Sequence, residues 1–355
     1  MERFDVLVTK CSFKSVRAVL VFTLAIFASA TANADEPQPE IRVGIIGLDT
    51  SHVTVFTKLL NDPKSEPPLK GLRVVAAFPA GSPDFPASRD RIENFTKQVG
   101  DLGVEIVGSI DELLPKVDAV LLESVDGRVH LEQAMPVIAA KKPLFIDKPV
   151  AADLADVLTI YGAAKKHGTP VFSSSSSRFS PGYPELLDDP KVGEIAGADV
   201  YSRTVPTQGH PDLFFYGIHG TELLFTLMGT GCEQVTAVAT PKFEQVTGVW
   251  SNGRVGTYRG VKEPLKVGVG ATVFGTNGTA YRDNRYDYKP LVAEIATFFR
   301  TGEPPVSPEE TIEIFAFLTA AEKSKADGGR TVTLDEVLEE ARAKSDEKSA
   351  AQRVE

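Results

Sequence analysis

The sequence predicts an α/β chain with a doubly wound parallel sheet followed by an α+β domain whose sheet is mostly antiparallel. Over residues 41–168, short apolar runs alternate with helical stretches, the pattern of strands covered by helices on both faces. From residue 169 onward this rhythm stops, and turn signals such as Asn252-Gly253 appear between strand-like segments. With 355 residues, 42% of them apolar, the chain is long enough for more than one core.

The first 34 residues resemble a secretory signal. Four basic residues accompany an apolar run over residues 18–28, and the small residues Ala32-Asn33-Ala34 fit a cleavage pattern. We therefore expect cleavage after Ala34 and a periplasmic or secreted protein, with residues 35–40 as a linker. An uncleaved anchor is the alternative, although the apolar run is short for a membrane span. No later segment is long and apolar enough to cross a bilayer.

The elements of the first domain follow from these runs in order. A strand is expected wherever four to seven apolar residues come together, and a helix wherever the next segment is amphipathic. The expected strands are 41–47, 72–78, 104–107, 119–123 and 144–146. The expected helices are 53–60, 89–99, 110–114, 131–140 and 152–166. Together they make a domain over residues 41–168, whose ligands should bind beyond the carboxyl ends of the strands.

The second domain is expected over residues 169–335. Val171-Phe172 and the serines that follow read as a linker or as the strand that opens this domain. Further strands are expected at 194–203, 234–240, 246–258 with a hairpin turn, and 266–274. Ser307, Pro308 and Glu310 form a capping box for a long helix that ends at Gly328-Gly329. Residues 336–355 read as a charged helical tail.

Composition excludes several classes of function. Acidic residues outnumber basic ones by 48 to 38, for a net charge of −10, which disfavours a nucleic-acid partner. The two cysteines, Cys11 and Cys232, are too few for a disulfide framework or a cysteine-rich metal site. Only Cys232 follows the expected cleavage point, and a buried thiol is expected there.

The loop after the first strand, Gly47-Leu48-Asp49-Thr50-Ser51-His52, is the first candidate ligand site. A dinucleotide fingerprint needs glycine at 47, 49 and 52, and only Gly47 is present. Asp49 would compete with a phosphate for the positive end of the following helix. Thr50 and Ser51 can still offer hydroxyl and backbone donors. An ordinary helix cap explains the same residues equally well.

Three further loops converge at the same edge of the sheet. After the second strand no acid occurs before Asp84, so the sequence does not choose between NAD and NADP. In the third loop, Ser124 to His130, the histidine is expected to pack or cap. In the fourth, Asp147-Lys148-Pro149, the lysine can carry a proton or stabilise an oxyanion. A structural Lys–Asp pair is the alternative.

A second cluster of polar residues lies at 210–222. It holds His210, Asp212, Tyr216, His219 and Glu222, in a chain with five histidines in all. The spacing of His219 and Glu222 places both on one helix face. Because no zinc-ligand spacing is present, we predict no metal site. The sequence also lacks a P-loop and a Gly-x-Ser-x-Gly nucleophile elbow.

Several motifs occur in an order that identifies a family. The stretch 118–149 resembles an Asp-x-Val strand, a histidine-bearing helix start and a Glu-Lys-Pro motif in which Asp147 replaces Glu. Residues 177–181 resemble an Arg-x-x-Pro motif, and Gly217-Ile218-His219 with Glu222 resembles Asp-x-Gly-x-His-x-x-Asp. In this order they resemble the Gfo/Idh/MocA family, which includes glucose-fructose oxidoreductase and inositol dehydrogenase. The resemblance covers nearly the whole chain after residue 34.

The resemblance implies a Rossmann-type domain that binds NAD or NADP, and oxidation or reduction of a sugar, polyol or other carbohydrate-like ligand. It places Lys148 near the nicotinamide and makes His219 the residue that exchanges the substrate proton. We expect cofactor contacts from Gly47, Asp49, Thr50, Ser51, Ser124, Lys148 and Pro149. We expect substrate contacts from Arg178, His210, Asp212 and Tyr216. The family also implies a homo-oligomer formed through the second sheet.

Departures from the family pattern leave three functions open. Asp49 and His52 replace two fingerprint glycines, and Phe215 stands where the motif has an acid. The first function is an exported oxidoreductase that holds NAD(P) tightly. The second is a carbohydrate-binding protein of the same fold that has lost dinucleotide binding. The third is a lyase or hydrolase that uses Lys148, His219 and nearby acids.

Overall fold

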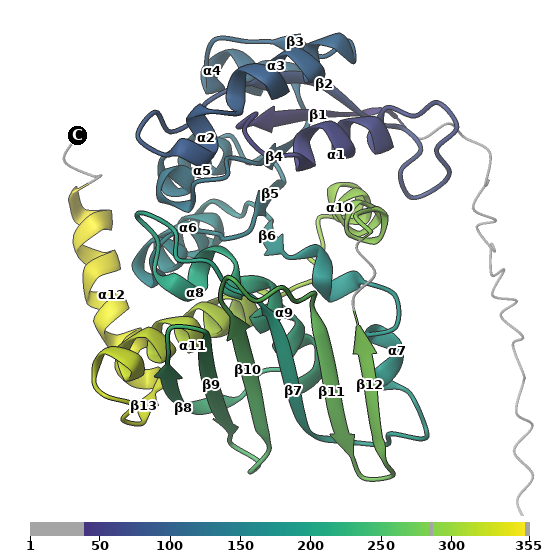
Figure 1. The fold of residues 1–355 in the computed structure, drawn as a ribbon. Helices are drawn as coiled ribbons and strands as arrows, with labels where there is room; N and C mark the ends of the chain where they lie inside the picture. Colours follow the sequence, from purple (N-terminus) through teal and green to yellow (C-terminus); the bar gives the residue numbers. More distant parts are fainter. Residues whose placement is uncertain (1–38, 284–286, 352–355) are drawn as a thin grey trace, which may run out of the picture. The chain divides into compact units, whose positions relative to one another are not determined.

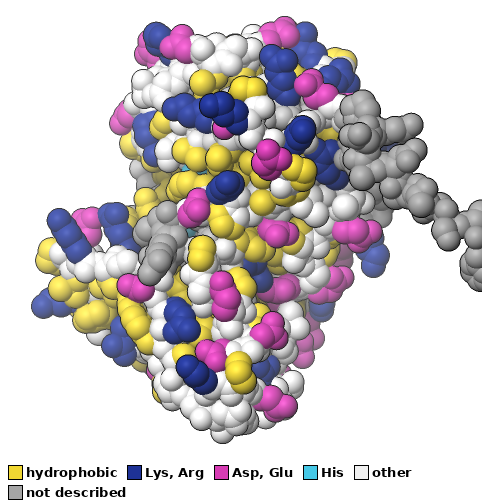
Figure 2. All heavy atoms as spheres, turned by 90° about the vertical axis from the view of Figure 1, so that its right-hand side faces the viewer, with side chains coloured by type: hydrophobic (Ala, Val, Ile, Leu, Met, Phe, Trp, Pro, Cys, Tyr) yellow, Lys and Arg dark blue, Asp and Glu magenta, His cyan; other side chains and the backbone are white. Residues whose placement is uncertain are grey.

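The computed structural model describes residues 39–283 and 287–351 (Figure 1). The expected signal segment, residues 1–34, and most of the linker lie outside these ranges. Within them no helix has the length and apolar character needed to cross a membrane. On the face shown in Figure 2, basic and acidic side chains are interspersed rather than segregated.

The first sheet has six parallel strands, within the described residues, in the order β3-β2-β1-β4-β5-β6. Its strands are β1 (Ile41–Ile46), β2 (Leu72–Phe78), β3 (Glu105–Ile106), β4 (Ala119–Leu122), β5 (Leu144–Asp147) and β6 (Val171–Ser174). This confirms the predicted doubly wound sheet. The predicted role of residues 171–174 was wrong: β6 pairs in parallel with β5, so the segment closes the first sheet instead of opening the second domain.

The helices of this half are α1 (His52–Leu60), α2 (Pro86–Arg89), α3 (Ile92–Asp101), α4 (Ile110–Leu113), α5 (His130–Ala139) and α6 (Leu154–His167). The helix expected at 89–99 is divided at residues 90–91 into α2 and α3. Helix α6 begins where the Asp153 carboxylate accepts the Asp156 N–H at 3.0 Å, and it ends at Gly168 with φ +68°. A capping carboxylate and a left-handed glycine are the usual signals for these two ends.

Both faces of the first sheet are buried. Alternate residues of β4 contribute to two apolar clusters, Val120 and Leu122 to one and Leu121 to the other. Helices α4, α5 and α6 belong to the first cluster, whereas α1, α3 and α10 (Lys289–Thr301) belong to the second. Helix α10 comes after strand β12 (Thr279–Asp283) of the second sheet, so the sequence returns to cover a sheet built more than a hundred residues earlier (Figure 1).

The second sheet has seven strands, within the described residues, in the order β12-β11-β7-β10-β9-β8-β13. They are β7 (Ile195–Arg203), β8 (Cys232–Ala239), β9 (Phe243–Trp250), β10 (Val255–Val261), β11 (Gly270–Gly275), β12 (Thr279–Asp283) and β13 (Val332–Thr333). Among these described strands only the β7–β10 pair is parallel, which confirms a mostly antiparallel sheet. The strand expected from residue 266 begins later, because the first residue to pair with β7 is Gly270.

Helices α9 (Gly217–Met228) and α11 (Pro308–Ala326) pack on one face of this sheet (Figure 1). The core there contains Trp250, Tyr258 and Phe317, all almost fully buried. Gly220 lets α9 lie close to the sheet, because a Cβ at this position would come within 2.3 Å of the Tyr258 ring. The predicted capping of α11 is confirmed: the Ser307 hydroxyl accepts the Glu310 N–H at 3.1 Å.

Helix α12 (Leu334–Ala351) is more than a charged tail. Val337 and Ala341 are buried in the same apolar cluster as α6 and α11. The hydroxyls of Thr159 on α6 and Ser345 on α12 lie 2.9 Å apart. The sequence predicted a helix here, but the apolar residues that dock it are widely spaced among charges.

The packing of α10 generates a stability prediction. Phe298 is fully buried, and its ring lies 4.7 Å from that of Phe172 on β6. We expect Phe298→Ala to lower the free energy of unfolding by about 3–5 kcal/mol, because it leaves a cavity under the first sheet. The neighbouring exposed Thr297→Ala should change it by less than about 0.5 kcal/mol. Equal values for the two variants in chemical unfolding would contradict this packing.

Candidate functional site

The loops after β1 and β4 are in contact. These two strands are neighbours at the point where the strand order of the first sheet reverses. Gly47 has φ +89°, and a Cβ there would lie 2.3 Å from both the backbone nitrogen and the hydroxyl of Ser124. Only glycine fits this contact. The Ser124 hydroxyl is itself engaged, since it donates to Gln133 Oε1 at 2.7 Å. The contact fixes the switch point of the sheet, where doubly wound folds bind ligands.

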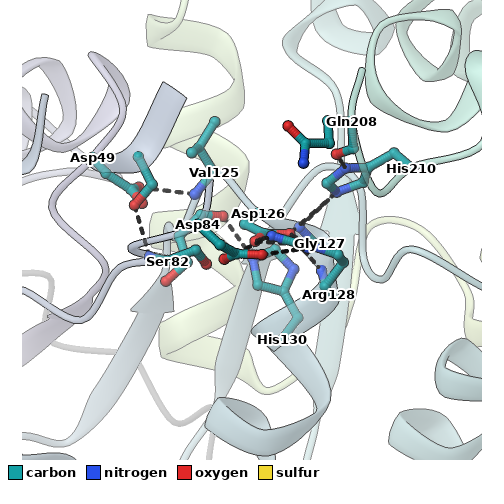
Figure 3. A network of polar contacts seen from close by, with 12 residues as sticks. Asp49, Ser82, Asp84, Val125, Asp126, Gly127, Arg128, His130, Gln208 and His210 are labelled. Carbon is teal, nitrogen blue, oxygen red and sulfur yellow. Dashed lines mark hydrogen bonds and ion pairs between the residues drawn. The ribbon is translucent and has the colours of Figure 1, made fainter. Parts of the chain in front are cut away.

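Asp49 is fully buried beneath the loop after β4 (Figure 3). Its Oδ1 accepts the Val125 N–H at 2.8 Å, and burial raises the pKa of this carboxyl group. The sequence predicted that the Asp49 carboxylate would lie at the start of α1 and compete there with a phosphate group. The structure instead uses the side chain to join two loops. Ser51 remains exposed at the N-terminus of α1, where it makes no side-chain cap.

His52 joins two carboxylates at the same edge. Its Nδ1 lies 2.8 Å from Asp147 Oδ2 and 3.8 Å from Glu123 Oε2, and its Nε2 lies 3.2 Å from the Tyr288 hydroxyl. Glu123 directly follows β4 and is fully buried, and neither of its carboxylate oxygens has a hydrogen-bond partner. Burial and the adjacent Asp147 raise the pKa of Glu123 well above its usual range.

Asp147 responds in the opposite direction. Burial alone would raise its pKa, but the positive charges of His52 and Lys148 and the hydrogen bond from His52 lower it below the usual range. Of these two neighbouring carboxyl groups, Asp147 therefore loses its proton more readily than Glu123 does. Such a separation is common at functional sites.

Lys148 and His219 lie beside this group. The Lys148 ammonium lies 5.9 Å from the centre of the Phe215 ring, and His219 Nδ1 lies 2.7 Å from the Ser175 hydroxyl. Burial, together with the charge of Lys148, lowers the pKa of His219 well below its usual value. The imidazole is therefore neutral near neutral pH and can accept a proton. The structure thus brings together the two residues that the sequence proposed for catalysis.

His210 belongs to a different network (Figure 3). Its Nε2 accepts the Gly127 N–H at 3.1 Å and lies 3.4 Å from Asp126 Oδ1, and burial lowers its pKa. Arg128 pairs with Asp126 at 2.7 Å and with Asp84 at 2.9 Å. This network ties the loop after β4 to the second domain.

The remaining predicted substrate residues have structural partners. Arg178 pairs with Glu222 at 2.9 Å and with Glu310 at 2.7 Å, and Asp212 pairs with Lys325 at 3.0 Å. The Tyr216 ring lies 5.4 Å from the Arg203 guanidinium and 6.2 Å from the His219 ring. In the part of the chain that the structure describes, the polar side chains of residues 210–222 are therefore paired with several different partners.

Sequence reasoning missed three residues of this region: Glu123 near Lys148, Ser175 beside His219, and Tyr288 beside His52. One signal was available: Glu123 continues a wholly apolar strand, where a charged residue is rare unless it has a role. Ser175 and Tyr288 carried no such signal. They reach the site only because β6 joins the first sheet and α10 returns to it.

The comparisons with known proteins agree with this geometry. Residues 41–175 match the GFO_IDH_MocA family model, described as an oxidoreductase family with an NAD-binding Rossmann fold. Over residues 41–175 the chain is therefore similar to the Gfo/Idh/MocA family. The chain is 26% identical over 281 residues to a myo-inositol 2-dehydrogenase of Thermotoga maritima, a match that covers 63% of this chain and 82% of the relative. It is 30% identical over 183 residues to inositol 2-dehydrogenase 3 of Saccharopolyspora erythraea, which covers 48% of each.

Solved structures share the fold of this chain at low identity. The structure of GenD2 from gentamicin A biosynthesis, in complex with NAD, aligns with a TM-score of 0.68 at 17% identity, covering 83% of this chain and 97% of the other. The scyllo-inositol dehydrogenase of Lactobacillus casei, with bound NAD(H) and scyllo-inositol, aligns with a TM-score of 0.67 at 15% identity, covering 83% and 99%. Both alignments extend through the two domains.

The buried Asp49 generates a pH prediction. Because its pKa is raised in the folded state, the folded protein binds this proton more tightly than the unfolded chain does. Stability therefore falls as pH rises through that window. Asp49→Asn keeps an acceptor for Val125 and removes the titration, so we expect a higher unfolding midpoint near about pH 7 and a flatter profile down to about pH 4. The exposed Asp188→Asn should follow the wild-type profile. Parallel profiles for all three proteins would refute this role of Asp49.

Proposed function

We propose that this protein is an NAD(P)-dependent dehydrogenase that acts on a secondary alcohol of a cyclic polyol or sugar. The observation that carries the proposal is the placement of Lys148 near enough to His219 for its charge to help burial lower the pKa of the imidazole, in a chain whose first sheet matches an NAD-binding fold. A cation that polarises a hydroxyl and an imidazole that takes its proton are the two groups such an oxidation requires. The names of the similar inositol dehydrogenases support a polyol as substrate.

The turn after β1 fits a dinucleotide in part. Gly47 makes the tight turn, the Asp49 carboxylate is withdrawn beneath the next loop, and Ser51 is exposed at the positive end of α1. Gly47, Thr50, Ser51 and Ser124 would hold the phosphates, with Lys148 and Pro149 at the nicotinamide end. Asp84 is paired with Arg128. This pair therefore does not indicate whether the coenzyme has a free ribose 2′-hydroxyl, as in NAD, or a 2′-phosphate, as in NADP.

When bound, the coenzyme supplies a hydride acceptor or donor. The residues of the chain supply the rest of the chemistry. The Ser175 hydroxyl engages Nδ1 of His219 and leaves Nε2 to exchange the proton of the alcohol. Lys148 is oriented towards the same space by the Phe215 face, and its charge favours the developing alkoxide. Phe215, which replaces an acid of the family motif, excludes water and leaves His219 as the proton acceptor.

Substitution of the lysine tests the proposal. We expect wild-type protein to reduce NAD or NADP in the presence of myo-inositol, scyllo-inositol or a related sugar. Lys148→Met should lower kcat/KM by at least about 100-fold while the unfolding midpoint stays close to that of wild type. The exposed Lys165→Met on α6 is the matched control and should keep full activity. Dinucleotide reduction that is unchanged in Lys148→Met would overturn the assignment.

A binding protein without redox chemistry is the second candidate. The two missing fingerprint glycines and Phe215 favour it. Thermal unfolding with added ligands separates the candidates: a dehydrogenase is stabilised by NAD(H) or NADP(H), whereas a binding protein is stabilised by the sugar alone. Turnover of a sugar without any nicotinamide would instead indicate a lyase or hydrolase.

We also propose that the chain is exported and forms a homo-oligomer. The basic and apolar N-terminal segment with Ala34 supports export. The open face of the second sheet carries the exposed side chains of Val255, Phe274 and Tyr281, which support self-association. One preparation tests both properties: protein recovered from the periplasm or medium should begin at Asp35 by intact mass and exceed the monomer mass by light scattering. Cytoplasmic, full-length monomer would contradict both.

A further inference from the structure

The group formed by His52, Glu123 and Asp147 has a property that the proposed dehydrogenase chemistry does not explain. One potential ligand atom from each residue lies within 4.8 Å of the other two, and all three residues are buried. Both oxygens of Glu123 and Oδ1 of Asp147 lack hydrogen-bond partners. A buried carboxylate without partners costs several kcal/mol, roughly, unless a cation or a proton compensates it.

We propose that His52, Glu123 and Asp147 form a binding site for a divalent transition-metal cation such as Zn²⁺ or Mn²⁺. Ligand atoms about 2.0–2.2 Å from one ion lie roughly 3–3.5 Å from each other. The observed separations from His52 Nδ1 are 2.8 Å to Asp147 Oδ2 and 3.8 Å to Glu123 Oε2, on either side of that range. Small side-chain rotations therefore suffice to surround an ion.

The far side of His52 is arranged as in known metal sites. With Nδ1 directed at the carboxylates, Nε2 lies 3.2 Å from the Tyr288 hydroxyl on the segment that leads into α10. A ligating histidine usually donates its second N–H to such a partner, which fixes both the tautomer and the ring plane. The ring also stacks on Phe56, at 5.5 Å between centroids. The imidazole is therefore held in place before any ion arrives.

The donor set indicates the class of ion. One imidazole nitrogen with two carboxylate oxygens suits Zn²⁺, Mn²⁺ or Fe²⁺, whereas Mg²⁺ prefers oxygen ligands alone. Three protein ligands leave a coordination position for water or for an alcohol oxygen, as in catalytic zinc sites. Lys148 adds positive charge nearby, but within the described ranges no ion pair within 4 Å joins it to Glu123.

The site is also placed where a cation would matter. His52 occupies the third glycine position of the fingerprint, and Glu123 and Asp147 end neighbouring strands at the switch point. Two carboxylates at that point repel an anionic ligand. A bound cation would offset their charge, so the same residues that depart from the dinucleotide pattern would restore an environment that accepts one.

Metal binding to the full chain tests the site without any substrate or dinucleotide. Protein treated with a chelator is titrated with Zn²⁺, Mn²⁺ or Mg²⁺ alone, and binding is followed by calorimetry, metal content and thermal unfolding. We expect wild type to bind a single equivalent of Zn²⁺ or Mn²⁺, to bind Mg²⁺ more weakly, and to unfold at a higher temperature with metal. Glu123→Gln should bind Zn²⁺ and Mn²⁺ at least about tenfold more weakly.

Two controls make the result specific. Without metal, Glu123→Gln should unfold at a higher temperature than wild type, because it removes a buried carboxyl group that is unfavourable to ionise and has no hydrogen-bond partner. Glu244→Gln removes another buried carboxylate, which pairs with Lys262 at 2.8 Å, and should bind metal as wild type does. Wild type that binds no metal, or equal binding by wild type and Glu123→Gln, would overturn the site. Because no dinucleotide is present, either result leaves the dehydrogenase proposal to its own test.

Discussion

The close contact between Gly47 and Ser124 is the constraint on which the candidate site depends. It brings the loops after β1 and β4 together at the centre of the first sheet, and the hydrogen bond from Val125 to Asp49 holds them there. Every residue of chemical interest on the first domain is positioned from these loops or from the adjacent end of β5. A side chain at position 47 would separate the loops and displace Glu123, which immediately precedes Ser124.

The charges around this contact are distributed in two groups. On one side, Asp126 pairs with Arg128 at 2.7 Å, and its Oδ1 lies 3.4 Å from His210 Nε2. On the other, Glu123 and Asp147 both lie close to His52 and are influenced by the charge of Lys148, and three of their four carboxylate oxygens have no hydrogen-bond partner. The first group joins the domains. The second retains an electrostatic imbalance at the place where a ligand would bind.

Much of the fold could be predicted from the sequence. Short apolar runs that alternate with helical segments indicate a parallel sheet, and capping residues mark where those helices begin and end. Lys148 and His219 could also be proposed from the sequence, because their motifs are local; their catalytic roles stay a prediction. The sequence could not show that Asp49 turns inward or that Arg178 and Asp212 are occupied by Glu222 and Lys325. These outcomes depend on contacts between residues distant in the chain. For the same reason the dense polar stretch 210–222 suggested one site where the structure has several separate pairs.

Helix α10 covers one face of the first sheet, although it lies more than a hundred residues further along the chain. A fragment that stops at the end of the family match, residue 175, would leave Phe145 and Phe172 facing water. The first domain, without α10, is therefore not an independent folding unit in this chain. Any chimera that exchanges it with a relative has to transfer residues 289–301 as well, or to supply an equivalent cover.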